Sequence, residues 1–203
     1  MRKECTTTTK RAPARILHKL TLLCSFILVI SLGALPAQAT MVVALDLNAL
    51  IANADAIFMG TVEQSEAFWE EGIILTDATI VIEDCISEQP CREREIIRQV
   101  GGQIGDIMME VAGSEELRPG QQILFFGRRQ SNQSVLTPVG TAQGVFHIDN
   151  GHLHRDLTEI ILLSESGPVE AVEGLPETYH EMVNVIRERL ALPPMQIQDL
   201  NLQ

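Results

Sequence analysis

The stretch Leu117–Arg129 (LRPGQQILFFGRR) decides the fold class of this chain. Its first four residues form a turn signal, and Gln121–Arg129 carries the strongest strand pattern in the sequence. Similar strand patterns lie before and after it, and no helical pattern separates them. The chain is therefore predicted to be mainly β.

The other predicted strands are short and rich in β-branched residues. They are Ala56–Gln64, Ile73–Asp84, Glu95–Val100, Ile107–Val111, Ser134–Pro138, Gly144–Asp149 and Gly151–Asp156. Ser65–Gly72, which contains the only Trp, Trp69, is predicted to be a loop, and Met108-Met109 is predicted to be core and edge packing. Strands in this order, without intervening helices, favour a closed or nearly closed β-barrel over a parallel sheet.

One helix is predicted at each end of this run of strands. Asp46 can cap a short helix whose apolar positions recur on one face, and Pro176–Leu190 has an amphipathic helical pattern. Gly167–Gly174, before the second helix, is predicted to be a loop. The expected organisation is a small barrel over residues 40–156, a loop and a packed helix over 157–192, and a flexible tail over 193–203.

Residues 1–39 have the three-part pattern of a cleavable signal peptide. A basic start precedes the apolar run Leu20–Leu35, which ends in Pro36 and the small residues Ala37-Gln38-Ala39. Cleavage is expected before Thr40, which predicts a periplasmic or secreted protein. An uncleaved membrane anchor is the alternative, although the 16-residue run is shorter than the roughly 20 residues that a spanning helix needs.

The rest of the chain is very acidic. The whole sequence has 15 basic and 27 acidic side chains, and residues 1–39 contain six of the bases and one of the acids. Residues 40–203 therefore keep 9 basic and 26 acidic side chains, a net charge of −17. Such a surface repels nucleic acid and anionic lipid, so neither is expected as a partner. The acidity serves either solubility or the attraction of cations or of a basic partner.

Two cysteines remain after residue 39, Cys85 and Cys91. An even number in an oxidising compartment predicts a disulfide. The five residues between them have a turn-like composition, so the bond is expected to close a loop between strands.

The segment Phe146–Asp156 is rich in histidine. Asn150-Gly151 is the preferred centre of a two-residue type I′ turn. That turn would place four metal-ligand side chains on one face of a hairpin, because side chains alternate along a strand. They are His147, Asp149, His152 and His154. Three imidazoles and a carboxylate suit Zn²⁺ or Cu²⁺, whereas the alternative is an ordinary polar outer face.

No catalytic residues are predicted. The sequence has neither the G-x-S-x-G turn of hydrolases nor the H-E-x-x-H helix of metalloproteases. The chain is therefore not expected to be an enzyme, and no cofactor is expected apart from the possible metal.

Several segments between residues 46 and 150 resemble a family of uncharacterised bacterial secreted proteins. These segments are Asn53–Val62 (NADAIFMGTV), Gly101-Gly102, Gly120–Phe126 (GQQILFF) and Gln143–Phe146 (QGVF). More distantly, they are similar to netrin-like barrels, which include the tissue inhibitors of metalloproteinases. The resemblance implies an OB-like barrel. Those inhibitors place an N-terminal Cys on the protease zinc, but cleavage here would leave Thr40 first, so that mechanism is not transferable.

The leading hypothesis is an exported, non-enzymatic binding module that recognises another exported protein. Two alternatives stay open: a metal-binding protein that uses the histidine-rich hairpin, and a protease inhibitor that acts through a different surface.

Overall fold

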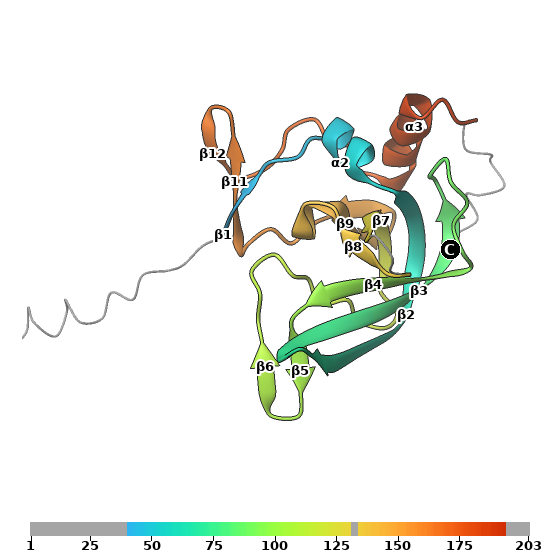
Figure 1. Cartoon of the computed structure of the whole chain (residues 1–203). Coiled ribbons are helices and arrows are strands. Elements are labelled where there is room, and N and C mark those ends of the chain that lie inside the picture. The colour runs from blue at the N-terminus through green and yellow to red at the C-terminus, as the bar shows by residue number, and fades with distance from the viewer. Residues whose placement is uncertain (1–39, 131–133, 194–203) are drawn as a thin grey trace, which may run out of the picture. The chain divides into compact units, whose positions relative to one another are not determined.

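The computed structural model describes residues 40–130 and 134–193. It is 48% strand and 15% helical, with a closed five-stranded barrel and two helices, which confirms the predicted fold class (Figure 1). The signal peptide predicted over residues 1–39, and the predicted tail apart from residue 193, lie outside the described residues.

Five strands form the barrel: β2 (Ala56–Glu70), β3 (Ile73–Cys85), β4 (Arg94–Val100), β7 (Gln122–Arg129) and β8 (Leu136–Pro138). Their order is β7-β2-β3-β4-β8, and β8 pairs back with β7 to close the barrel. Within it only β4 and β8 are parallel. A meander of three strands followed by two that return to the first is the Greek-key order of an OB-type barrel.

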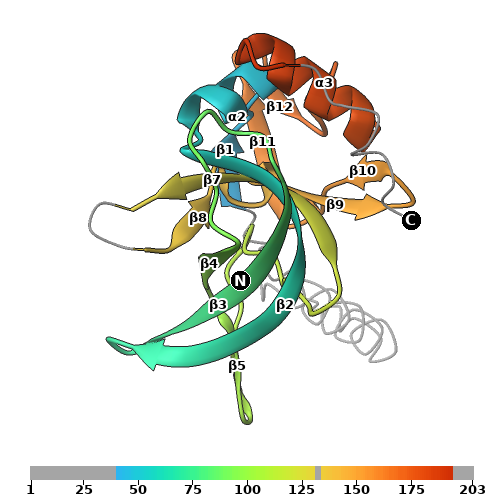
Figure 2. The same ribbon diagram turned by 90° about the vertical axis from the view of Figure 1, so that its right-hand side faces the viewer.

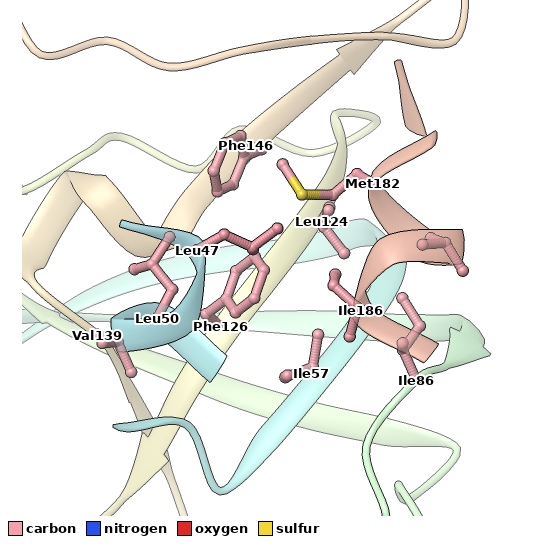
Figure 3. Packing of buried hydrophobic residues seen from close by; sticks show 11 residues of the cluster. Leu47, Leu50, Ile57, Ile86, Leu124, Phe126, Val139, Phe146, Met182 and Ile186 are labelled. Carbon is pink, nitrogen blue, oxygen red and sulfur yellow. The ribbon is translucent and has the colours of Figure 1, made fainter. Parts of the chain in front are cut away.

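Two hydrophobic clusters pack against the barrel strands because both faces of β7 are buried. We call the one inside the barrel the interior cluster and the one under the helices the outer cluster. Ile123 and Phe125 point into the barrel, whereas Leu124 and Phe126 point outward under the two helices. Figure 3 shows Phe126 between residues of both helices and Phe146. Burial on both faces explains why this segment is continuously apolar instead of alternating.

Both predicted helices are confirmed, with slightly shorter bounds. α2 (Leu47–Asn53) begins at Asp46, whose carboxylate accepts a 2.7 Å hydrogen bond from the Ala49 amide. α3 (Tyr179–Arg189) begins at Thr178 and buries three apolar side chains against the outer cluster. Among the described helices, none is long and apolar enough to cross a membrane.

The loop predicted over Ser65–Gly72 is wrong, because β2 continues to Glu70 and pairs with β3 to the end. The chain turns at Glu71 and Gly72, which both have positive φ. Register shifts at Met59/Gly60 and at Val62/Gln64 interrupt the alternation of side chains along β2. That interruption hid the outer half of the strand from a pattern of period two. Figure 2 shows the resulting long hairpin, which extends beyond the barrel.

A second, three-stranded sheet was not predicted. It consists of β1 (Thr40–Val43), β11 (Ile160–Ser164) and β12 (Gly167–Val169), so the prediction of a loop from Gly167 is also wrong at its start. β1 and β11 are parallel and distant in sequence, with Thr40 opposite Ile160. Strands this short, paired over such a distance, leave no local sequence signal.

Two further hairpins complete the fold. β5 (Gly102–Ile104) pairs with β6 (Ile107–Met109), and β9 (Val145–Asp149), which follows the 3₁₀ turn η1 (Thr141–Gly144), pairs with β10 (His152–His154). β9 also pairs with the first half of β7, which attaches the histidine-rich hairpin to the barrel.

Candidate functional site

A cleft of about 550 Å³ lies beside the β5–β6 hairpin, and we call it the hairpin cleft. Its floor includes Ser65 and Ala67 of β2 and Thr76 of β3. Met108 and Met109 of β6 and the segment that follows β6 form its walls. The cleft is therefore built on the extended β2–β3 hairpin that leaves the barrel.

The β5–β6 hairpin is fixed to this platform at its base. The Gly101 amide donates to the Ile74 carbonyl (2.8 Å), and the Thr76 hydroxyl donates to the Gly101 carbonyl (2.7 Å). Gly102 has a φ of 129°, and a Cβ there would lie 2.3 Å from the Thr76 hydroxyl oxygen. Only glycine fits this close approach, so the hairpin leaves the platform at a defined point.

The wall formed by the segment after β6 is held to β4. The Ser114 hydroxyl donates to the Val100 carbonyl (2.7 Å). The buried Gln99 amide accepts from the Glu115 N–H (3.3 Å) and donates to the Glu115 carbonyl. This wall could not be predicted from the sequence, because its residues have no periodicity.

Glu115 also joins this wall to the histidine-rich hairpin. Its carboxylate Oε1 contacts His147 Nε2, and the two side chains are only 9% and 13% exposed. The other carboxylate oxygen, Oε2, is buried without a hydrogen-bond partner. Hydrogen bonds from Thr158 hold the pKa of Asp156 below its usual range. Glu115 therefore joins the segment after β6 to β9 at His147.

The predicted hairpin register is confirmed. His147 pairs with His154 and Asp149 with His152, and the two rings of the first pair stack with centroids 5.3 Å apart. Asn150 and Gly151 have the positive φ values of a type I′ turn. Within residues 40–130 and 134–193, no group of three or more His, Cys, Asp or Glu side chains is arranged to hold a metal ion. Metal binding by His147, Asp149, His152 and His154 stays a prediction.

The lining of the hairpin cleft is acidic. It includes Glu110, Glu115, Glu116 and Glu159, and its one basic side chain is Arg118. Arg118 donates to Glu116 at 2.7 Å, which lowers the pKa of that carboxyl group. The one positive charge in the lining is therefore already paired.

Exposed apolar side chains are frequent on the two hairpins that border the hairpin cleft. The described residues have nine exposed large hydrophobic side chains, and six lie on the β2–β3 tip or on the β5–β6 hairpin and its flanks. We call these six the hairpin rim: Trp69, Ile73, Val100, Ile107, Met108 and Val111. Met108 lies on an edge strand, β6, and is 58% exposed, so it is not a core residue. Trp69 continues the row of Ser65 and Ala67 on the cleft face of β2, because alternate residues share a face. By the same register, Ile73 and Val100 lie on the other face of the sheet.

A larger hollow of about 900 Å³ lies near the disulfide, and the buried carboxylate in its lining, Glu95, is paired with arginine. The Glu95 carboxylate is 1% exposed and accepts from Arg129 at 3.0 Å, with Arg92 at 3.9 Å. The predicted disulfide between Cys85 and Cys91 is confirmed at the rim of this hollow. These interactions are structural.

No family model, curated protein or solved structure matches this chain in the three comparisons. The resemblance to secreted netrin-like proteins, and the protease-inhibitor alternative that came with it, therefore stay predictions.

Proposed function

We propose that this chain is a non-enzymatic binding module whose protein partner docks on the hairpin cleft and the hairpin rim. One observation carries the proposal: two thirds of the exposed large hydrophobic side chains of the described residues lie on the β2–β3 tip, on the β5–β6 hairpin and on its flanks. Exposed apolar surface is unfavourable by about 25 cal/mol per Å². Its concentration beside a cleft is typical of a surface that a partner covers.

The attachment of the two hairpins supports this proposal. Hydrogen bonds at Gly101 and Thr76 fix the base of the β5–β6 hairpin, while its tip carries Ile107 and Met108 into solvent. A binding surface on a fixed platform loses less conformational entropy on association than one on a free loop. Methionine also adapts its shape to an irregular partner surface.

The exported location is part of the proposal. The signal-peptide pattern of residues 1–39 supports it. The Cys85–Cys91 disulfide also supports it, because such bonds persist in oxidising compartments. The expected partner is therefore another exported or extracellular protein.

The test is selection of binders from a displayed library of random peptides, using residues 40–203 as bait. Selected peptides are then titrated against Met108→Ala and against the control Met41→Ala. Met41 is a matched control because it is 65% exposed and lies on β1, in the other sheet. Loss of Met108 should weaken binding about tenfold, as for a contributing interface residue, and loss of Met41 should change it less than about twofold. Equal affinities for the two variants would contradict the proposal.

A further inference from the structure

We infer that the partner presents a cationic polypeptide segment, with Arg or Lys side chains placed among apolar ones. This inference rests on the proposed function, because it names the chemistry of the partner for the same surface. Its basis is the charge that surrounds the hairpin rim.

The two hairpins that carry the rim are acidic throughout. Residues 66–73 and 102–111 contain five acidic side chains and no basic one. The acids are Glu66, Glu70, Glu71, Asp106 and Glu110. Glu66 and Glu70 alternate with Trp69 and point to the other face of β2. A partner on the cleft side meets Glu71, Asp106 and Glu110 instead, so the side chains that it places there are expected to be basic.

The arginines near this surface are already engaged. Arg98 donates to Asp77 at 2.7 Å and lies 3.8 Å from Glu70. Across the described residues, six of the nine arginines are in ion pairs with carboxylates. In those same residues no ion pair joins Glu71, Asp106 or Glu110 to a basic side chain. The negative charges of Glu71, Asp106 and Glu110 are thus not neutralised by an ion pair within the described residues.

The spread of these carboxylates favours a polypeptide over a metal ion. Glu71 lies at the β2–β3 turn, Asp106 at the β5–β6 turn and Glu110 at the mouth of the hairpin cleft. No group of three ligand side chains is arranged for a metal in the described part of the chain. A single cation cannot reach carboxylates that lie on separate turns, so the ligand must carry several positive charges. It must also carry apolar groups, because apolar side chains lie between those carboxylates. A segment of alternating basic and apolar residues supplies both.

The experiment uses three synthetic 12-residue peptides without tryptophan, in which Leu alternates with Arg, Gln or Glu. Trp69 is the only tryptophan and belongs to the hairpin rim, so its fluorescence reports binding without a label. The Arg peptide should bind the chain of residues 40–203 tightest and the Glu peptide weakest. High salt should weaken the Arg peptide most, because it screens exposed charges.

A matched pair of double variants separates local recognition from the attraction of any acidic protein for a basic peptide. Asp106→Asn with Glu110→Gln removes two charges at the surface, while Glu177→Gln with Glu188→Gln removes two exposed charges at α3. The first pair of substitutions should weaken the affinity for the Arg peptide at least about fivefold. The second pair should weaken that affinity less than about twofold. Circular dichroism should show both variants folded.

The outcomes distinguish this inference from the proposed function. The inference of a cationic partner is overturned if the Arg and Gln peptides bind equally well. It is also overturned if the two double variants lose equal affinity for the Arg peptide. The Met108→Ala and Met41→Ala comparison with library-selected peptides would be unaffected by that result. If instead those two single variants bind alike, the hairpin rim is not the docking surface and the proposed function fails.

Discussion

Among single side chains, Tyr179 makes the contact that ties α3 to the end of β3. Its hydroxyl donates to one oxygen of Asp84 (2.7 Å), and Arg187 donates to the other (3.0 Å). Burial, together with the negative charge of Asp84, raises the pKa of the Tyr179 phenol. The protonated form is therefore favoured in the folded chain.

We expect the only tyrosine of the chain to titrate well above pH 10 in the folded state. Because the folded pKa is the higher one, the contribution of Tyr179 to stability is complete below about pH 10, the ordinary tyrosine value, and is lost as the pH rises further. Ultraviolet absorbance of tyrosinate measures the titration directly. In guanidinium the same residue should titrate near pH 10, and Tyr179→Phe should remove this part of the alkaline loss. A native titration near pH 10 would contradict the expectation.

How far single residues could be predicted depends on whether their partners are local. Asn150-Gly151 fixes a two-residue turn by itself, so the pairing of His147 with His154 followed from the sequence alone. Glu115 meets His147 only because the segment after β6 folds back over β9. No motif marks Glu115, and the same holds for Gln99, which holds the Glu115 backbone from β4.

Among the elements, the connection from β3 to β4 is closed by the disulfide bond between Cys85 and Cys91. The bond joins Cys85, the last residue of β3, to Cys91 across six positions, and Ile86 between them is fully buried in the outer cluster. The disulfide therefore holds a core residue as well as a loop.

Replacing both Cys85 and Cys91 by Ser should lower the free energy of unfolding by about 2–3 kcal/mol, the amount expected for a short closed loop. Denaturant unfolding measures the change. Reduction of the unmodified protein is the control and should lower the stability by a similar amount. An unchanged denaturation midpoint in both experiments would show that the packing of Ile86 alone holds the loop.

The predicted elements were correct where the pattern is set by local chemistry. Asp46 and Thr178 cap helices whose apolar positions recur on one face, and both helices are present. β2 was predicted too short because its register shifts broke the alternation, which moved Trp69 from a strand into a supposed loop. That error concealed the hairpin rim, since Trp69 and Ile73 lie at the tip of a paired hairpin.

Considered as one molecule, the described chain consists of a closed barrel and a separate small sheet. The barrel has its own interior cluster and closes through β7 and β8. The small sheet depends on β1, which is held by Gln143 of η1. The Gln143 side chain accepts from the Leu45 amide (2.8 Å) and donates to the carbonyl of Val43, the last residue of β1 (3.0 Å).

A chain that begins at Ala44 instead of Thr40 lacks β1, and β11 should then lose its parallel partner while the barrel stays folded. Hydrogen exchange measures this region by region, because amides exchange when their local structure opens. Amides of β11 should lose protection, and amides of β7 should keep it. Equal loss of protection in β7 would mean that the barrel and the small sheet unfold as one cooperative unit.

The parallel pairing of β1 with β11 also sets an order of folding. Thr40 lies opposite Ile160, and the whole barrel sequence lies between them. Contacts between strands that are neighbours in sequence cost little loop-closure entropy. The contact between β1 and β11 costs more, because it closes a very long loop, unless the folded barrel has already brought the two strands close together. The barrel is therefore expected to form first. Until β11 is in place, β1 stays an unpaired, partly apolar segment. During that interval a chaperone that recognises extended apolar segments would find β1 accessible.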